Sequence, residues 1–198
     1  MLQSLMLSTM LKLKPLKIHN KNRFVNGWGL NNPSHCVFLM KKILILPKKR
    51  FDELMKRNGW NDANIPDNAA FISICCNPII KENYLKKIRK IDDEHWFKYN
   101  HQNVLNIEFD DIPCETKDTP YGMAYGLTDT DATRIADFVK ANQDKEIFYI
   151  HCMAGKSRSV GVGMAISNFY FVPMTCCQGT EERNEYVMLK VKEKLCLV

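Results

Sequence analysis

The sequence EIFYIHCMAGKSRSVGVGMAISNF, residues 146–169, decides how this chain folds. Its first six residues are mostly apolar and predict a buried strand, and residues 159–169 predict an apolar, glycine-containing helix that is buried on most sides. A loop therefore joins the carboxyl end of a strand to the start of a helix. In α/β sheets ligands bind at this edge, where the free N–H groups of helix N-termini point outward. The stretch predicts an anion-binding loop at residues 152–158.

Strands and helices alternate through the rest of the chain from about residue 40. Three further strands are expected at residues 43–46, 69–76 and 104–109, and three further helices at residues 51–57, 128–141 and 182–195. The first of these helices is expected to carry Asp52 and Glu53 in its first turn. The second begins with Thr128 and Asp131 in the spacing of a capping box. The alternation predicts an α/β domain over residues 40–198, with a central, mainly parallel sheet of four to five strands flanked by helices.

Basic residues are concentrated near the N-terminus. The 198-residue chain has 28 Lys plus Arg and 22 Asp plus Glu, which gives a formal net charge of +6. Residues 1–50 contain ten Lys or Arg and no Asp or Glu, so the remaining chain is slightly acidic. A hydrophobic fraction of 45% excludes a disordered or fibrous class. We interpret residues 1–39 as a flexible basic extension; its contact with nucleic acid or a membrane is the less favoured interpretation, because charge alone is nonspecific.

Eight cysteines raise the question of disulfides or a metal site. The first fourteen residues lack a membrane-spanning run and a signal cleavage site, so we expect a reducing, cytoplasmic location. No Cys-x-x-Cys pair occurs and the histidines are not spaced as zinc ligands, so we expect neither a metal nor another cofactor. Adjacent Cys75 and Cys76 are interpreted as small buried apolar residues. His95, Trp96 and His101 stand in a charged stretch and are interpreted as a surface loop.

Each residue type in the loop has a chemical use. Cys152 at the strand end would face the backbone N–H groups of residues 153–158, whose dipoles favour the thiolate, the stronger nucleophile. Arg158, six positions later, can hold two oxygens of a phosphoryl group with its guanidinium. Gly155 permits a tight backbone turn. Ser159 can donate its hydroxyl to the sulfur, and His151 is expected to hold the loop by hydrogen bonding and to tune the thiol.

The arrangement His-Cys, five residues, Arg-Ser resembles the signature of the cysteine-dependent protein tyrosine phosphatase superfamily, and the ending Ala-Gly-Lys-Ser-Arg-Ser is similar to its dual-specificity branch. The resemblance implies a monomeric enzyme that hydrolyses phosphotyrosine in a phosphorylated protein, with phosphoserine and phosphothreonine as further substrates. The reaction passes through a phosphocysteine without metal. Cys152 becomes the nucleophile and Arg158 the phosphate clamp. The phosphate-binding loop between them consists of Met153, Ala154, Gly155, Lys156 and Ser157.

The same family requires an aspartic acid on an upstream loop, which protonates the leaving oxygen and later activates water. Residues 105–111, Leu-Asn-Ile-Glu-Phe-Asp-Asp, resemble the segment in which a strand ends just before this acid. The resemblance assigns Asp111 as the acid and Asp110 as its supporting neighbour, although the turn geometry after Phe109 decides between them. Residues 112–127 lengthen this loop, either as a mobile flap over the substrate or as a solvated insertion.

Other interpretations of the loop stay open at this point. A phosphate-binding module that has lost turnover would keep the same cradle, but the joint presence of nucleophile, clamp and acid argues against it. RNA 5′-phosphates and phosphoinositides remain alternative substrates because Lys156 adds positive charge beside the cradle. A nucleotide-binding P-loop is disfavoured, since its first glycine would fall on Ile150. A rhodanese-like sulfur transferase gives no reason for Asp111 or for Arg158.

Overall fold

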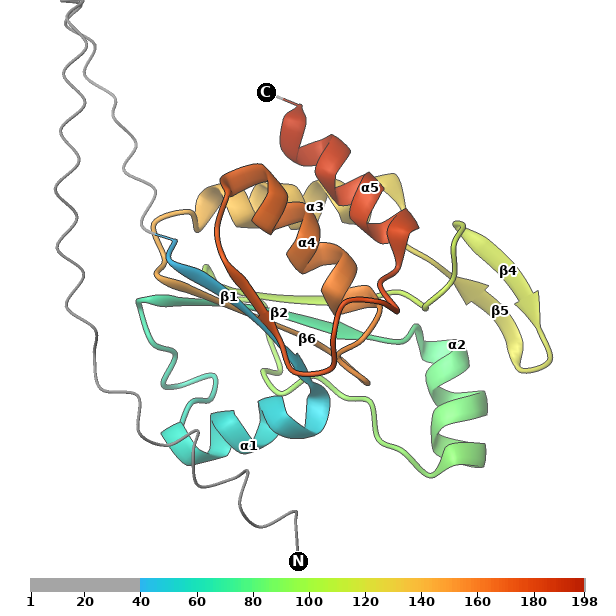
Figure 1. Ribbon diagram of the computed structural model, residues 1–198. Coiled ribbons are helices and arrows are strands. Elements are labelled where there is room, and N and C mark those ends of the chain that lie inside the picture. Colours follow the sequence, from blue (N-terminus) through green and yellow to red (C-terminus); the bar gives the residue numbers. More distant parts are fainter. Residues whose placement is uncertain (1–39, 198) are drawn as a thin grey trace, which may run out of the picture. The chain divides into compact units, whose positions relative to one another are not determined.

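The computed structural model describes residues 40–197, and the expected basic extension at residues 1–39 lies outside them (Figure 1). Its centre is a five-stranded parallel sheet in the order β3-β2-β6-β1-β7. The strands are β1 (Lys42–Pro47), β2 (Ala69–Cys75), β3 (Val104–Glu108), β6 (Ile147–Cys152) and β7 (Met174–Cys176). The expected α/β class and the parallel sheet are confirmed.

Helices cover both faces of the sheet (Figure 1). On one face lie α3 (Asp129–Ala141), α4 (Arg158–Tyr170) and α5 (Glu185–Cys196), and on the other lies α1 (Lys48–Asn58). Beyond the end of β2, a short α2 (Pro78–Ile80) continues into the π-helix η2 (Lys81–Arg89). A small antiparallel hairpin consists of β4 (Thr116–Thr119) and β5 (Gly122–Tyr125). No helix within residues 40–197 is long and apolar enough to cross a membrane.

Two apolar clusters hold these layers together. The larger lies between the sheet and α3, α4 and α5, and the smaller lies under α1. Alternate residues of β6 belong to different clusters: Phe148 and Ile150 to the larger, Tyr149 to the smaller. Successive side chains of a strand point to opposite faces, so a central strand that is covered on both sides must be apolar almost throughout. This requirement explains why the stretch before Cys152 was recognisable as a buried strand.

Most expected elements are confirmed with small shifts at their ends. Thr128 is the N-cap of α3, because its Oγ1 accepts the Asp131 N–H at 3.1 Å; the Asp131 carboxylate accepts the Thr128 hydroxyl at 2.8 Å rather than the backbone N–H of a full capping box. The expectation for α1 is wrong in one respect. This helix begins at Lys48, directly after Pro47, so Asp52 and Glu53 do not lie in its first turn. Proline lacks the N–H that would extend the sheet ladder, and the chain turns into the helix at once.

Five elements had no sequence-based assignment: α2, η2, β4, β5 and β7. Asn77 accepts the N–H groups of Ile79 and Ile80 at 2.8 and 3.3 Å and thereby caps α2, with Pro78 at its first position. The Asn-Pro pair had indicated only the end of β2, although both residues also favour a helix start. β7 has three residues of mixed exposure and pairs with β1 alone, so no periodicity could reveal it.

His95 and Trp96 lie in a loop, as expected, but both rings are half-buried rather than fully exposed. The His95 Nδ1 is 2.7 Å from the Ser73 Oγ, and the Trp96 Nε1 donates to the backbone oxygen of Trp60 at 2.8 Å. Trp96 packs against the smaller apolar cluster, on the same face of the sheet as α1.

Candidate active site

Four strands of the sheet end at the same edge, and the residues that follow them form the candidate site. β1 leads into Lys48, β2 into Cys76, β3 into Asp110, and β6 ends at Cys152. β6 stands in the middle of the sheet order, between β2 and β1. A ligand beyond the end of such a central strand reaches loops from both sides. Cys152 therefore occupies the centre of this edge.

The loop at residues 153–157 closes tightly between β6 and α4. Gly155 has a φ of +67°, and a Cβ placed there would lie 2.5 Å from the backbone nitrogen of Pro47. The tight turn that was expected at Gly155 is confirmed. Among residues 40–197, no acceptor takes a hydrogen bond from the backbone N–H groups of residues 154–157. Free N–H groups in front of a helix provide a cradle for an anion.

Cys152 is almost fully buried, with 3% of its surface exposed. Its Sγ lies 3.1 Å from the Oγ of Ser159, the contact expected of a hydroxyl that serves the sulfur. Two further cysteines lie at the end of β2, where burial raises the pKa of the Cys76 thiol to about 12 and also raises that of Cys75. These two thiols stay protonated at neutral pH. Cys152 is the candidate nucleophile because it stands at the centre of this edge, directly before the loop with free N–H groups.

Arg158 begins α4 and is 4% exposed. Its Nη1 donates to the backbone oxygen of Phe109 at 2.7 Å, and its Nε has no hydrogen-bond partner among residues 40–197. Burial acts to lower the pKa of the guanidinium, but groups that are negatively charged at the high pH where it titrates, first the Cys76 and Cys152 sulfurs and then the Asp93 and Asp111 carboxylates, act against burial. The net pKa lies above its ordinary value. Arg158 is therefore a fixed cation that retains free donors for an anion.

His151 lies fully buried beneath the loop. Its ring packs on that of Phe51 from α1, with centroids 4.1 Å apart. The expected hydrogen bond to the loop is not formed, since neither ring nitrogen has a partner at hydrogen-bonding geometry within residues 40–197. Burial lowers the pKa of His151 well below its usual value. The neutral ring fixes the end of β6 by packing against α1 rather than by hydrogen bonding.

Asp110 is buried, and its carboxylate is used within the fold. It accepts the backbone N–H of Asn77 at 3.2 Å and the backbone N–H of Tyr125 at 2.8 Å, and it also accepts the side-chain amide of Asn77. Burial raises the pKa of Asp110 above its usual value. These contacts tie the end of β3 to the start of α2 and to the hairpin.

Asp111 is exposed and lies beside the loop. Its Oδ1 accepts the Ser157 hydroxyl at 2.7 Å and the Asn184 side-chain amide at 2.8 Å. Ser157 belongs to the loop at residues 153–157, whereas the partners of Asp110 do not. Of the two adjacent carboxylates, Asp111 is the one that contacts this loop.

The segment after Asp111 is mostly exposed at residues 113–123, as expected of a solvated insertion, and it also has regular structure. It contains the β4–β5 hairpin, whose tip is held by η2. The Tyr121 ring stacks on the Tyr84 ring, with centroids 4.5 Å apart, and the Asn83 side-chain amide donates to the backbone oxygen of Tyr121 at 3.1 Å. The hairpin therefore supports the acid loop from outside the sheet.

Lys156 is paired rather than free. Its Nζ lies 2.9 Å from the carboxylate of Glu182, in the segment that precedes α5. Lys156 thus places a positive charge beside the cradle, and the carboxylate of Glu182 offsets part of it. Two further loop residues differ in exposure: Ala154 faces solvent, and Met153 is half-buried.

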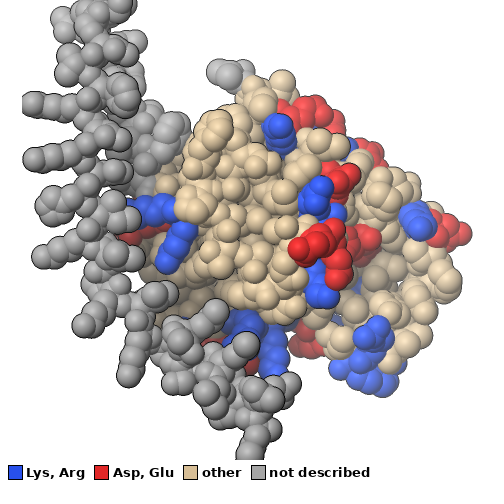
Figure 2. All heavy atoms as spheres, in the orientation of Figure 1, with Lys and Arg blue, Asp and Glu red and all other residues tan. Residues whose placement is uncertain are grey.

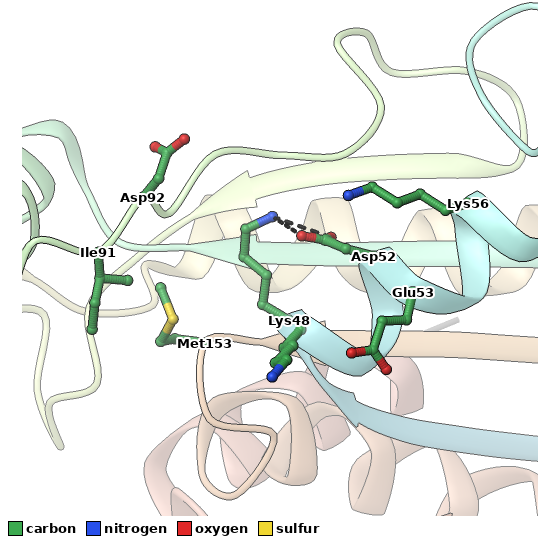
Figure 3. A pocket seen from close by; sticks show the side chains of 8 residues that line it. Lys48, Asp52, Glu53, Lys56, Ile91, Asp92 and Met153 are labelled. Atoms are coloured by element: carbon green, nitrogen blue, oxygen red, sulfur yellow. Dashed lines mark hydrogen bonds and ion pairs between the residues drawn. The ribbon is translucent and has the colours of Figure 1, made fainter.

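A hollow of about 390 Å³ opens next to Met153 (Figure 3). In Figure 3, α1 provides one wall, with an ion pair between Lys48 and Asp52, and the chain after η2 provides the other, with Ile91 and Asp92. The backbone N–H of Lys48 donates to the Met153 oxygen at 3.2 Å, so this wall is fixed to the loop. The hollow extends the candidate site beyond the anion cradle. Its complete lining is Lys48, Lys49, Asp52, Glu53, Lys56, Ile91, Asp92 and Met153.

Sequence reasoning missed Asn184 and Asn77, which hold the two carboxylates. Each precedes a helix and accepts an N–H of its first turn, so a helix N-cap was a detectable signal for both. Their second contacts, to Asp111 and Asp110, join residues that are 73 and 33 positions apart and left no local signal.

Within residues 40–197, no three His, Cys, Asp or Glu side chains come together in a group that could hold a metal ion. Comparisons of the chain with protein-family models, with curated proteins and with solved structures found no match.

Proposed function

We propose that this protein is a cysteine-dependent phosphatase of the dual-specificity type, which hydrolyses phosphotyrosine in proteins and takes phosphoserine and phosphothreonine as further substrates. One observation carries the proposal: Cys152, in contact with Ser159, stands before a loop with free N–H groups that ends at the buried cation Arg158. An anion cradle that contains a nucleophile suits the transfer of a phosphoryl group.

In the first step, the Cys152 thiolate attacks the phosphorus of the bound phosphomonoester. The S–P bond forms while the bond from phosphorus to the leaving oxygen breaks, and Asp111 gives its proton to that oxygen. The loop N–H groups and the guanidinium of Arg158 hold the three remaining phosphoryl oxygens.

In the second step, water hydrolyses the phosphocysteine. The Asp111 carboxylate takes a proton from the attacking water, the S–P bond breaks, and inorganic phosphate leaves. The Ser159 hydroxyl, 3.1 Å from the sulfur, donates to the departing thiolate and makes it the better leaving group. The enzyme returns to its starting state, with the thiolate on Cys152 and the proton on Asp111.

The proposal is tested by turnover of an aryl phosphate. We expect the wild-type protein to hydrolyse it with a bell-shaped dependence on pH, and Cys152→Ser to abolish the reaction. Asp111→Asn should lower kcat by about 10²–10⁴ if the residue acts as general acid. Acid quenching during turnover should trap phosphate on Cys152, which mass spectrometry of the peptide containing this residue would detect.

Two results would contradict the proposal. Unchanged turnover in Cys152→Ser would remove the nucleophile, and tight binding of a phosphopeptide without turnover by the wild-type protein would identify a phosphate-binding module instead. The substrate class needs its own measurement, with phosphopeptides, phosphoinositides and 5′-phosphorylated RNA compared side by side. The pairing of Lys156 with Glu182 weakens the reason for the last two classes.

A further inference from the structure

Asn184 is a residue to which neither the loop motif nor the proposed mechanism assigns a role. It is the N-cap of α5, and its Oδ1 accepts the backbone N–H of Val187 at 3.1 Å. This contact uses the acceptor half of the side-chain amide and explains an asparagine at a helix start. The donor half of the amide is left for another partner.

That donor half reaches the acid loop. The Asn184 Nδ2 donates to the Asp111 Oδ1 at 2.8 Å and lies 3.3 Å from the backbone oxygen of Ile112. The Asn184 backbone N–H donates to the backbone oxygen of Ser157 at 3.3 Å. One residue thus contacts the start of α5, the acid loop and the phosphate-binding loop.

Close packing of α4 against α5 fixes the place of Asn184. A Cβ added to Gly161 of α4 would lie 2.6 Å from the Asn184 backbone oxygen, so only glycine lets the two helices approach this closely. The position of the side-chain amide is therefore set by two helices whose apolar faces are buried in the main core. A group held in this way can orient a neighbour on an exposed loop.

The contacts distinguish the two oxygens of Asp111. Its Oδ1 accepts from both Asn184 and Ser157, whereas no residue between 40 and 197 donates to its Oδ2. A carboxylic acid that accepts two hydrogen bonds on one oxygen must carry its proton on the other oxygen. The Oδ2 is then the atom that is free to transfer a proton to a leaving group.

We propose that Asn184 is a positioning residue for the general acid: it holds the Asp111 carboxyl by Oδ1, so that the proton stands on Oδ2 toward the substrate. The inference rests on the proposed phosphatase function. Asn184 itself touches neither the substrate nor the reacting atoms. A role in capping α5 alone would affect stability, whereas a positioning role affects proton transfer.

The test uses the dependence of the rate on the leaving group, because a general acid matters most when the leaving oxygen is strongly basic. Asn184→Ser keeps an acceptor for the cap but removes the amide donor. With phenyl phosphate, we expect kcat/KM to fall by about 10- to 100-fold, the cost of a misplaced catalytic group. With an aryl phosphate whose ring carries strongly electron-withdrawing groups, the fall should be less than about threefold.

A second variant, Asn184→Asp, caps α5 equally well but places a second carboxylate next to Asp111. The second negative charge favours the protonated form of the Asp111 carboxyl. The alkaline limb of the pH–rate profile should therefore move to higher pH.

Thr128→Ala is the matched control, since it removes the N-cap of another helix, and the Thr128 side chain contacts Asp131 rather than Asp111. It should lower the unfolding midpoint and leave the ratio of the two kcat/KM values unchanged. Equal losses on both substrates in Asn184→Ser, or the same change of ratio in Thr128→Ala, would overturn the positioning role while the phosphatase proposal stands. A wild-type protein without turnover, or turnover that persists in Cys152→Ser, would overturn both proposals.

Discussion

Asp110 carries a carboxylate in surroundings that disfavour its charge. Burial raises its pKa although two backbone N–H groups donate to it, so the folded state binds the proton more tightly than the unfolded state does. Such a group contributes stability that is fully present below the unfolded pKa and is lost as pH rises through the folded pKa. The stability contribution of Asp110 should therefore grow as the solution is acidified from neutral pH.

Asp110→Asn isolates this contribution because the amide keeps the shape but does not titrate. We expect the free energy of unfolding of the wild type, relative to that of Asp110→Asn, to become larger when the pH is lowered from 7 to 4. Urea denaturation at both pH values measures the change. Asp137→Asn, on the exposed side of α3, is the control for the general loss of a negative charge. Equal pH dependence in the two variants would show that the burial of Asp110 is not the cause.

Single residues of the site were predictable where a local rule applied, and not where a distant contact decides. Cys152, Gly155 and Arg158 follow from one strand–loop–helix stretch, in which backbone geometry and spacing fix their places. Asp110 and Asp111 are neighbours with equal local signals. Their difference comes from Asn77, Tyr125, Ser157 and Asn184, which approach them from other parts of the chain.

At the scale of elements, the β4–β5 hairpin links η2 to the acid loop. Its tip stacks Tyr121 on Tyr84, and its base supplies the Tyr125 N–H to Asp110 and accepts the Asp110 N–H at 2.6 Å. The hairpin is consequently held at both of its ends: by η2 at the tip and by Asp110 at the base. Loosening the tip should weaken the fold locally without removing any group that touches the substrate.

Tyr121→Ala tests this link. An aromatic pair contributes about 0.5–1.5 kcal/mol beyond its area, so we expect a loss of unfolding free energy of that size. Tyr99→Ala is the matched control: Tyr99 is 66% exposed and its ring stacks on no other ring among residues 40–197, so its loss should cost less than about 0.5 kcal/mol. Chemical denaturation of both variants gives the comparison. Equal losses would mean that the hairpin is not anchored through Tyr84.

Elements with a clear run or period of apolar residues, or with a recognisable N-cap, were predictable. Elements that form only by pairing with a distant part of the chain were not. The buried strands and α3 carried clear signals of apolar runs and of Thr128 before Asp131. β7 is formed by backbone pairing with β1 over three residues, and this pairing does not depend on the polarity of their side chains. The hairpin turns at residues 120–121, directly before Gly122, which has a φ of +113°, but the surrounding residues lack the alternation that predicts strands.

At the scale of the whole described domain, positive charge gathers on two elements beside the site. α1 and residues 81–90 hold ten of the 23 Lys and Arg, but three of the 22 Asp and Glu, in residues 40–197. Figure 2 shows Lys and Arg side chains grouped at the lower right, where η2 lies. Lys49 lines the hollow beside Met153, and Lys90 lines a second hollow of about 420 Å³ that shares Ile91 and Asp92 with it. The net charge of the full chain, +6, hides this local asymmetry.

This asymmetry predicts a preference for substrates with acidic residues next to the phosphorylated one. The double change Lys49→Glu and Lys90→Glu should raise KM for such a phosphopeptide by about 3- to 10-fold at low salt, as expected for a few screened surface charges. Neither lysine forms an ion pair within residues 40–197, so the change breaks no recorded contact of this kind. The same variant should hydrolyse a small aryl phosphate at nearly the wild-type rate, because the cradle at residues 152–158 is unaltered.

Lys42→Glu with Lys192→Glu provides the control, with the same change of net charge at the amino end of β1 and on α5. Its KM for the acidic phosphopeptide should stay within about twofold of the wild type, since charges more than a Debye length away are screened. Raising the ionic strength to about 0.5 M should remove most of the difference between the two double variants. If both raise KM equally, net charge alone governs binding and the hollows beside Met153 do not select the substrate. If only the variant at Lys49 and Lys90 does so, the charge on α1 and η2 sets the preference, while the loop that carries Cys152 sets the chemistry.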